Sequence, residues 1–194
     1  MPKPGEQQNS ILVVSGSERF NALVRQAADR AHFPRIVYHA DASTARRSLL
    51  EYGYDLVVIN CPLPDEFGHE LAMDAAGRWG AGVLVVVPAE VYEMTLENVT
   101  DAGVLAVSKP TTRERLGQAI RFLAAMQGRM RDLRRQVQKA AEKMDELRVV
   151  SKAKILLVEK KHMTEEEAHR LIGREAMDHG LSRRRIAEQI LDEL

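Results

Sequence analysis

The side chains of this sequence that could do chemistry are mostly basic, and they gather in one stretch. Residues 126–161 hold 11 lysine and arginine side chains against 5 acidic ones, whereas the whole chain carries 28 of each charge. Such a local excess suits a polyanionic partner, because lysine and arginine neutralise phosphates and release their counterions. The candidate phosphate contacts in this stretch and shortly after it are Arg148, Lys152, Lys154, Lys160, Lys161 and Arg174. The alternative is that these charges are only the solvated flank of a helix.

The sequence lacks the residue sets that catalysis or metal binding would need. The six histidines are scattered, and the single cysteine, Cys61, excludes a disulfide within the chain. No glycine-rich phosphate loop, Ser/His/Asp set or paired carboxylate motif is present. We therefore expect a protein that is not an enzyme and that uses no cofactor and no metal.

Length and composition predict one globular domain with a substantial appendage. The chain has 194 residues, of which 45% are hydrophobic and 29% charged. Residues 1–10 are polar and contain two prolines, which predicts a flexible N-terminus rather than a signal peptide. No run approaches the ~18 apolar residues of a membrane span. We expect a soluble, cytoplasmic protein without membrane contact.

Residues 11–122 alternate short β-branched apolar runs with amphipathic helical patterns. The apolar runs cover residues 11–14, 35–38, 56–59, 83–87 and 104–107. Ser17 and Asp41 are suitable N-caps for the helices that follow them, and Thr111 with Glu114 fits a capping box. Five runs of this kind separated by helices predict an α/β fold, a (βα)5 doubly wound parallel sheet.

A single long helix is predicted to begin near Thr112 and to end near Lys161, since no proline follows residue 110 and no glycine lies between Gly128 and Gly173. Within its first part, residues 112–150, apolar residues alternate spacings of three and four, as in a coiled coil. This seam consists of Leu123, Met126, Met130, Leu133, Val137, Ala140, Met144 and Leu147. We expect a homodimer; the alternative is a helix that folds back on its own chain.

The last part, residues 140–194, predicts a small three-helix bundle on the end of the long helix. Thr164 and Glu167 form a capping box for one further helix. Gly180 and Ser182 then end that helix and begin another. Helices this short need to pack against one another to be stable.

The N-terminal pattern resembles the receiver domain of two-component response regulators over nearly all of residues 10–125. The resemblance is carried by the segment DLVVINCPLPDEFG at residues 55–68 and by Ser108-Lys109-Pro110. In receivers the third strand ends in an aspartate that accepts a phosphoryl group, and here that position is Asn60. An amide is not a usable nucleophile for forming an acyl phosphate.

Other parts of the receiver site are also replaced. Receivers have a pair of acidic residues after the first strand, and here Ser15 and Gly16 occupy those positions. Receivers have a hydroxyl residue at the end of the fourth strand, and here Pro88 or Val87 replaces it. Only Lys109 is the residue that the family has. The resemblance therefore implies a pseudo-receiver that is not phosphorylated and that a protein or ligand contact controls.

The C-terminal pattern resembles the ANTAR domain, the RNA-binding antiterminator module of AmiR- and NasT-type regulators. Four segments carry the resemblance in order, at residues 148–157, 164–171, 174–177 and 186–190. Ile155 departs from the family, which usually has glycine after the Ala-Lys pair. Ala153 and Ala176 would matter by being small, either for helix packing or for the approach of a loop base.

Together these features predict a homodimeric transcription antitermination regulator that binds hairpins in the leader of nascent mRNA. A sensor or sequestering protein is a plausible further partner. Two other functions stay open on the sequence alone: a protein-interaction adaptor and a DNA-binding regulator. The consecutive Arg183, Arg184 and Arg185 lie on different faces of a helix, which disfavours DNA.

Overall fold

A computed structural model describes residues 10–29 and 31–193 of the chain. The described residues form two compact units, divided between Met130 and Arg131. The predicted flexible N-terminus, residues 1–10, lies outside the described residues except for Ser10, which is buried and begins the first strand.

The first unit alternates strands and helices as the sequence predicts. Its strands are β1 (Ser10–Val14), β2 (Arg35–His39), β3 (Leu56–Asn60), β4 (Gly82–Val87) and β5 (Leu105–Ser108). Between them lie α1 (Glu18–Ala27), α2 (Ala42–Glu51), α3 (His69–Gly77), the 3-10 turn η1 (Ala89–Val91) and α4 (Tyr92–Val99). Each strand lies within two residues of its predicted apolar run.

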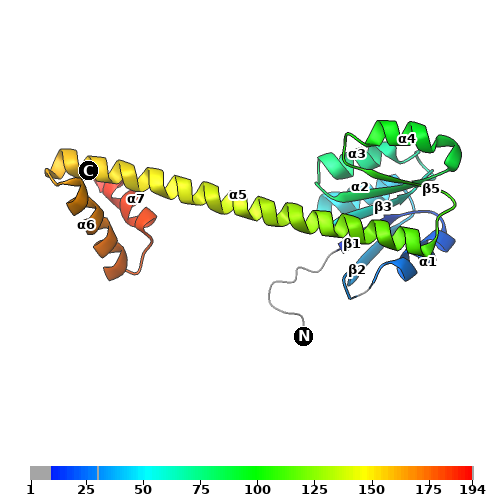
Figure 1. Cartoon of the computed structure of the whole chain (residues 1–194), viewed down its shortest axis with the longest axis horizontal. Helices are drawn as coiled ribbons and strands as arrows, with labels where there is room; N and C mark the ends of the chain where they lie inside the picture. Colours follow the sequence, from blue (N-terminus) through cyan, green and yellow to red (C-terminus); the bar gives the residue numbers. More distant parts are fainter. Residues whose placement is uncertain (1–9, 30, 194) are drawn as a thin grey trace. The chain divides into compact units, whose positions relative to one another are not determined.

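The five strands form one parallel sheet in the order β2-β1-β3-β4-β5, with helices on both faces (Figure 1). On one face, α2, α3 and α4 pack their buried residues against alternate side chains of the strands, such as Leu12, Val57 and Val85. On the other face, α1 and the first turns of α5 cover strand residues that include Val13 and Val58. The predicted doubly wound (βα)5 fold is confirmed.

Local capping fixes where the helices begin. Ser17 Oγ accepts from the backbone N of Phe20, and Asp41 Oδ1 from that of Thr44, so both predicted N-caps are confirmed. The predicted capping box of Thr111 with Glu114 is wrong. The hydroxyl of the next residue, Thr112, accepts from the backbone N of Arg115 at 3.3 Å.

Helix α5 (Arg113–Lys161) is one unbroken helix of 49 residues, as predicted to within a residue. Leu116, Ile120 and Leu123 lie on its first turns and are buried in the core of the first unit. The placement of Leu123 in the dimer seam is therefore corrected, because its own unit covers its side chain. The exposed part of the seam begins at Met126.

The second unit contains the rest of α5 with α6 (Glu165–Asp178) and α7 (Arg183–Glu193), which lie beside the C-terminal turns of α5 (Figure 1). The predicted capping box at Thr164 and Glu167 is complete, with both reciprocal hydrogen bonds present. Gly180 adopts φ +62° after α6, a backbone conformation that glycine adopts without strain. Ser182 Oγ then accepts from the backbone N of Arg185 at the start of α7.

Within the part of the chain that the structure describes, no helix is both long and apolar enough to span a membrane.

Candidate functional site

The first candidate site is the carboxyl edge of the sheet in the first unit. Ser15 follows β1, Asn60 ends β3, Pro88 follows β4 and Lys109 follows β5. In an open parallel sheet, ligands bind at this edge, where the strand order reverses between β1 and β3. The structure thus brings together the residues that the sequence assigned to the altered receiver site.

The centre of this edge is a neutral hydrogen bond instead of a group of carboxylates. Asn60 Nδ2 donates to Ser15 Oγ at 3.0 Å, and both side chains are buried. Ser15 Oγ also accepts from the backbone N of Ser17 at 3.1 Å. Asn60 Oδ1 is buried without a hydrogen-bond partner among the described residues. Gly16, at the second acidic position, supplies no ligand.

Lys109 points into the same edge and is held by the backbone. Its ammonium donates to the carbonyl oxygen of Cys61, the residue after β3. Burial lowers the pKa of Lys109 and raises that of the Cys61 thiol to about 12, so this thiol stays protonated and unreactive at neutral pH. The Lys109–Pro110 and Cys61–Pro62 peptide bonds are both cis. Of the residues that the sequence assigned to this edge, Lys109 is a cation and none is a carboxylate.

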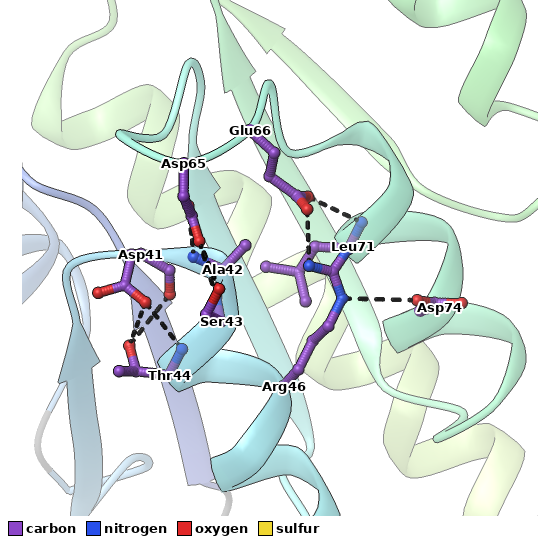
Figure 2. Close-up of polar contacts among 9 residues, drawn as sticks. All are labelled: Asp41, Ala42, Ser43, Thr44, Arg46, Asp65, Glu66, Leu71 and Asp74. Atoms are coloured by element: carbon purple, nitrogen blue, oxygen red, sulfur yellow. Dashed lines mark hydrogen bonds and ion pairs between the residues drawn. The ribbon is translucent and has the colours of Figure 1, made fainter.

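The nearest acidic residues of the β3–α3 loop are engaged elsewhere (Figure 2). The carboxylate of Asp65 accepts from the backbone N of Ala42 at 2.9 Å and of Ser43 at 3.0 Å, and so caps the N-terminus of α2. These hydrogen bonds lower its pKa to about 2. Nowhere in residues 10–29 and 31–193 do three or more potential metal ligands come together. This loop therefore stabilises α2.

An ion pair adds a second tie between the loop and α2. Arg46 Nη1 lies 2.6 Å from Glu66 Oε2, and Arg46 Nε lies 3.8 Å from Asp74 Oδ2 on α3. The other oxygen of Glu66 accepts from the backbone N of Leu71 at 3.4 Å. Sequence spacing could not reveal the ties of this loop to α2, because the residues that they join lie 20 or more positions apart.

The second candidate site is the surface of the C-terminal unit, which surrounds a core rich in alanine. Four of its seven buried residues are Ala153, Ala168, Ala176 and Ala187. Small side chains let three helices approach closely. Ala153 is fully buried, so the structure corrects its assignment as an RNA contact: its methyl group is covered by the other helices. Packing is also the role of Ala176.

The structure separates Lys154 from the other candidate phosphate contacts. Its Nζ lies 2.7 Å from Glu165 Oε1 at the start of α6, and only 21% of its side chain is exposed. This ion pair lowers the pKa of Glu165. Lys154 therefore forms an ion pair that ties α6 to α5, and its role as a phosphate contact stays a prediction.

The remaining predicted basic residues are exposed. Arg148 and Lys152 lie one helical turn apart on α5, and Lys160 and Lys161 end that helix. On α6, Arg174 lines a shallow pocket together with Arg170, which the sequence analysis missed. Arg170 and Arg174 lie four residues apart in the helix that the capping box begins. This spacing could have indicated that the two arginines share a helix face.

The three consecutive arginines at the start of α7 do not form a base-reading surface. Arg184 contacts Asp145 of α5 at 2.8 Å and Glu188 at 2.9 Å. Arg185 lies 3.5 Å from the same Glu188. Because two of the three arginines pair with acidic residues, the observed contacts disfavour α7 as a DNA-recognition helix.

The seam of α5 from Met126 onward is an exposed row of apolar side chains. The larger side chains are between 43% and 70% exposed: Met126, Met130, Leu133, Val137, Met144 and Leu147. Ala140 is exposed as well. None of residues 10–29 and 31–193 covers these side chains, so the described structure contradicts the alternative of a helix that folds back on its own chain. An apolar row of this kind is a candidate interaction surface.

Comparisons with known proteins agree with the description of the first unit and with that of the C-terminal unit. The ANTAR domain family matches residues 138–191. The transcriptional regulatory protein PdtaR, from two strains of Mycobacterium tuberculosis, is 30% identical to this chain over 141 residues, which cover 72% of this chain and 68% of that protein.

Solved structures resemble the first unit in fold. A signal receiver domain from Pseudomonas fluorescens has a TM-score of 0.58 at 18% identity, and the match covers 68% of this chain and 97% of that one. A CheY-like response regulator receiver domain from Methanospirillum hungatei has a TM-score of 0.55 at 19% identity, covering 64% and 99%.

Proposed function

Because this chain belongs to the ANTAR-domain response regulators and has a receiver-like first unit, we propose that it is a transcription antitermination regulator that binds hairpins in nascent mRNA. The observation that supports this best is a set of exposed basic residues in the C-terminal unit: Arg148, Lys152, Lys160 and Lys161 of α5 and Arg174 of α6. Arg170 adds a further cation beside Arg174 on α6. We propose a binding function for these residues and no enzymatic one.

The regulator acts by mass action on RNA folding. A hairpin held by the C-terminal unit is withdrawn from the competing terminator stem, so the terminator forms less often. A homodimer, paired through the exposed seam of α5, presents two such units to two hairpins in one leader. The second binding event is then intramolecular, which raises the overall affinity without new contacts.

The first unit controls this activity by binding and not by phosphorylation. Asn60, Ser15 and Gly16 give the edge of the sheet no carboxylate to accept a phosphoryl group or to hold Mg²⁺. A sensor or sequestering protein, or a small ligand, that contacts this unit would then set how much regulator is available.

The test is binding of the full chain to a tandem-hairpin RNA, compared with a scrambled stem and with a DNA duplex of equal length. Filter binding from about 50 to about 300 mM salt gives the slope of log affinity against log salt. We expect a preference for the tandem hairpins. Equal affinity for duplex DNA would favour a DNA-binding regulator, and no nucleic-acid binding would leave the adaptor function.

Single variants locate the RNA surface. Replacing Lys152 or Arg170 by alanine should reduce the salt slope by about 0.7–0.9, the value of one lost phosphate contact. Lys154→Ala should reduce it less, because Lys154 is paired with Glu165. Arg47→Ala is the matched control: it removes one exposed charge from α2 in the other unit and should leave the slope unchanged.

A further inference from the structure

The residues that flank the exposed seam of α5 carry charge of one sign only. In a coiled coil, the positions on either side of the apolar row face the partner helix and influence its orientation. In α5 these flank residues are Gln127, Arg129, Arg134, Gln136, Ala141, Lys143, Arg148 and Val150. The acidic residues of this stretch, Asp132, Glu142, Asp145 and Glu146, all lie outside the flanks. A second copy of α5 therefore finds no opposite charge on the flanks to pair with.

A parallel pairing of two copies would bring like charges together. In a parallel, in-register pair, residues 129, 136 and 143 each face the residue five positions further along the other helix. Arg129 would face Arg134 of the second copy, and Lys143 would face Arg148. Both contacts between charged residues are repulsive, and each occurs twice in a symmetric dimer. Nothing on the flanks compensates for them.

An antiparallel pairing can avoid every one of these contacts. If Val137 lies opposite Ala140 of the second copy, the flanks on one side bring Arg134 to Ala141. On the other side, Gln136 faces Lys143. The outer flank positions in this register pair Gln127 with Arg148 and Arg129 with Val150. Gln127 also donates to the Gly80 carbonyl oxygen of its own unit, and Val150 also packs against the core of its own unit. Each basic residue then meets a neutral one.

Shifting the antiparallel pair by one heptad in either direction restores repulsion. One shift brings Arg134 opposite Arg148 of the second copy and Lys143 opposite itself. The other shift brings Arg134 opposite itself and Arg129 opposite Lys143. The charge pattern therefore selects both an orientation and a register.

Packing along the seam favours the same arrangement. In a parallel pair, Ala140 would face Ala140 and leave a gap between the two helices. In the antiparallel register, the small Ala140 faces the larger Val137, and Leu133 faces Met144. The layers then have more nearly equal volumes, which suits close packing without voids.

We propose that two copies of this chain pair through α5 in antiparallel orientation, with Val137 of each copy opposite Ala140 of the other. This proposal rests on the homodimer of the proposed function and adds its orientation and register. The midpoint of the pair lies between residues 138 and 139 of each helix.

Disulfide crosslinking of the full chain tests the orientation. The Leu133→Cys chain and the Met144→Cys chain are prepared separately, and one of them carries a tag so that the two differ in length. The two chains are then mixed and oxidised at a protein concentration at which sedimentation shows a dimer. In the proposed register, residue 133 of one copy lies beside residue 144 of the other. Two copies of residue 133 are separated by about 16 Å along the axis, too far for a disulfide. The native chain, with only the buried Cys61, is the control.

The expected result is a crosslink between the two different chains in the mixture and none in either variant alone. Crosslinks of each variant with itself would show a parallel pair and overturn the proposal while leaving the seam dimer intact. A dimer without any crosslink would place the contact on another surface and also overturn it. A monomer in sedimentation would contradict the homodimer itself, whatever the RNA binding.

A charge reversal gives an independent readout. In a parallel pair, Arg134→Glu would turn the two repulsive contacts between Arg129 and residue 134 into attractive ones. These two contacts together would lower the dimer dissociation constant about tenfold. In the antiparallel register, residue 134 faces Ala141, so the dimer dissociation constant should change much less. A tenfold tighter dimer of Arg134→Glu in sedimentation equilibrium would contradict the proposal.

Discussion

Replacing Ala153 by leucine separates a packing role of this residue from a role in RNA contact. Ala153 has no exposed surface and lies in the alanine-rich core between α5, α6 and α7. A leucine adds three carbon atoms where neighbouring helices already touch, and overpacking of this kind costs about 1–3 kcal/mol. We expect the loss to be confined to the stability of the C-terminal unit.

The size of this unit makes the expected effect large. A single core below about 70–80 residues rarely supplies more than about 3–5 kcal/mol. A loss of about 1–3 kcal/mol is therefore a large fraction of the total. It lowers the melting temperature by about 4–8 °C for each kcal/mol in a domain of this size.

Hydrogen exchange of the full-length protein measures this unit directly. We expect faster exchange of the backbone amides of α6 and α7 in Ala153→Leu than in the native chain, with unchanged exchange in the first unit. Lys152→Leu is the matched control because residue 152 is exposed. This substitution should change the unfolding free energy of the C-terminal unit by no more than about 0.5 kcal/mol. Unchanged exchange in Ala153→Leu together with weaker RNA binding would refute the packing role.

Three further predictions concern the receiver-like unit and the seam. Acetyl phosphate with Mg²⁺ should leave the intact mass of both the native chain and Asn60→Asp unchanged, because no carboxylate stands at residue 15 or 16; a stoichiometric phosphorylated species would contradict this. Leu133→Glu should sediment as a monomer, since pairing would bury two unpaired carboxylates at a cost of several kcal/mol, whereas Arg135→Glu on the outer face should stay dimeric. The pKa of Asp65 is lowered from 3.8 to about 2, so its carboxylate stabilises the fold above pH 3.8, and this contribution is lost as the pH falls toward 2. Urea unfolding of the native chain should therefore depend more steeply on pH in this window than that of Asp65→Asn, and equal pH dependence would show that the cap contributes nothing.

Local patterns in the sequence predicted the elements of this fold closely. The β-branched runs match the strands because a parallel sheet covered on both faces needs continuous apolar segments. The caps Ser17, Asp41 and Thr164 were found because capping depends on residues three positions apart. Spacing favours Thr111 because Glu114 follows it by three positions, but Thr112 is the cap, and the backbone geometry that decides this is not visible in the spacing.

Contacts between distant elements could not be predicted in the same way. The pairing of Lys154 with Glu165 depends on how α6 returns against α5. The burial of Leu123 depends on how far the sheet covers the first turns of α5, although its spacing fits the seam equally well. The capping of α2 by Asp65 joins this loop residue to backbone groups more than 20 positions earlier in the chain. Each of these is a property of the tertiary structure.

The hydrogen bond from Asn60 to Ser15 also bears on how long a signal can persist at the edge of the sheet. A phosphoryl group on a carboxylate is a covalent mark that outlasts the encounter with the enzyme that placed it. An amide stores no such mark, so under the proposed control by a partner or ligand a change of state at this edge lasts only while that molecule is bound. The stabilisation of the bound state of this unit then depends on the free concentration of that partner relative to its dissociation constant. This stabilisation is lost at the rate at which the partner dissociates. A regulator built this way reports the present level of its partner and keeps no memory of earlier ones.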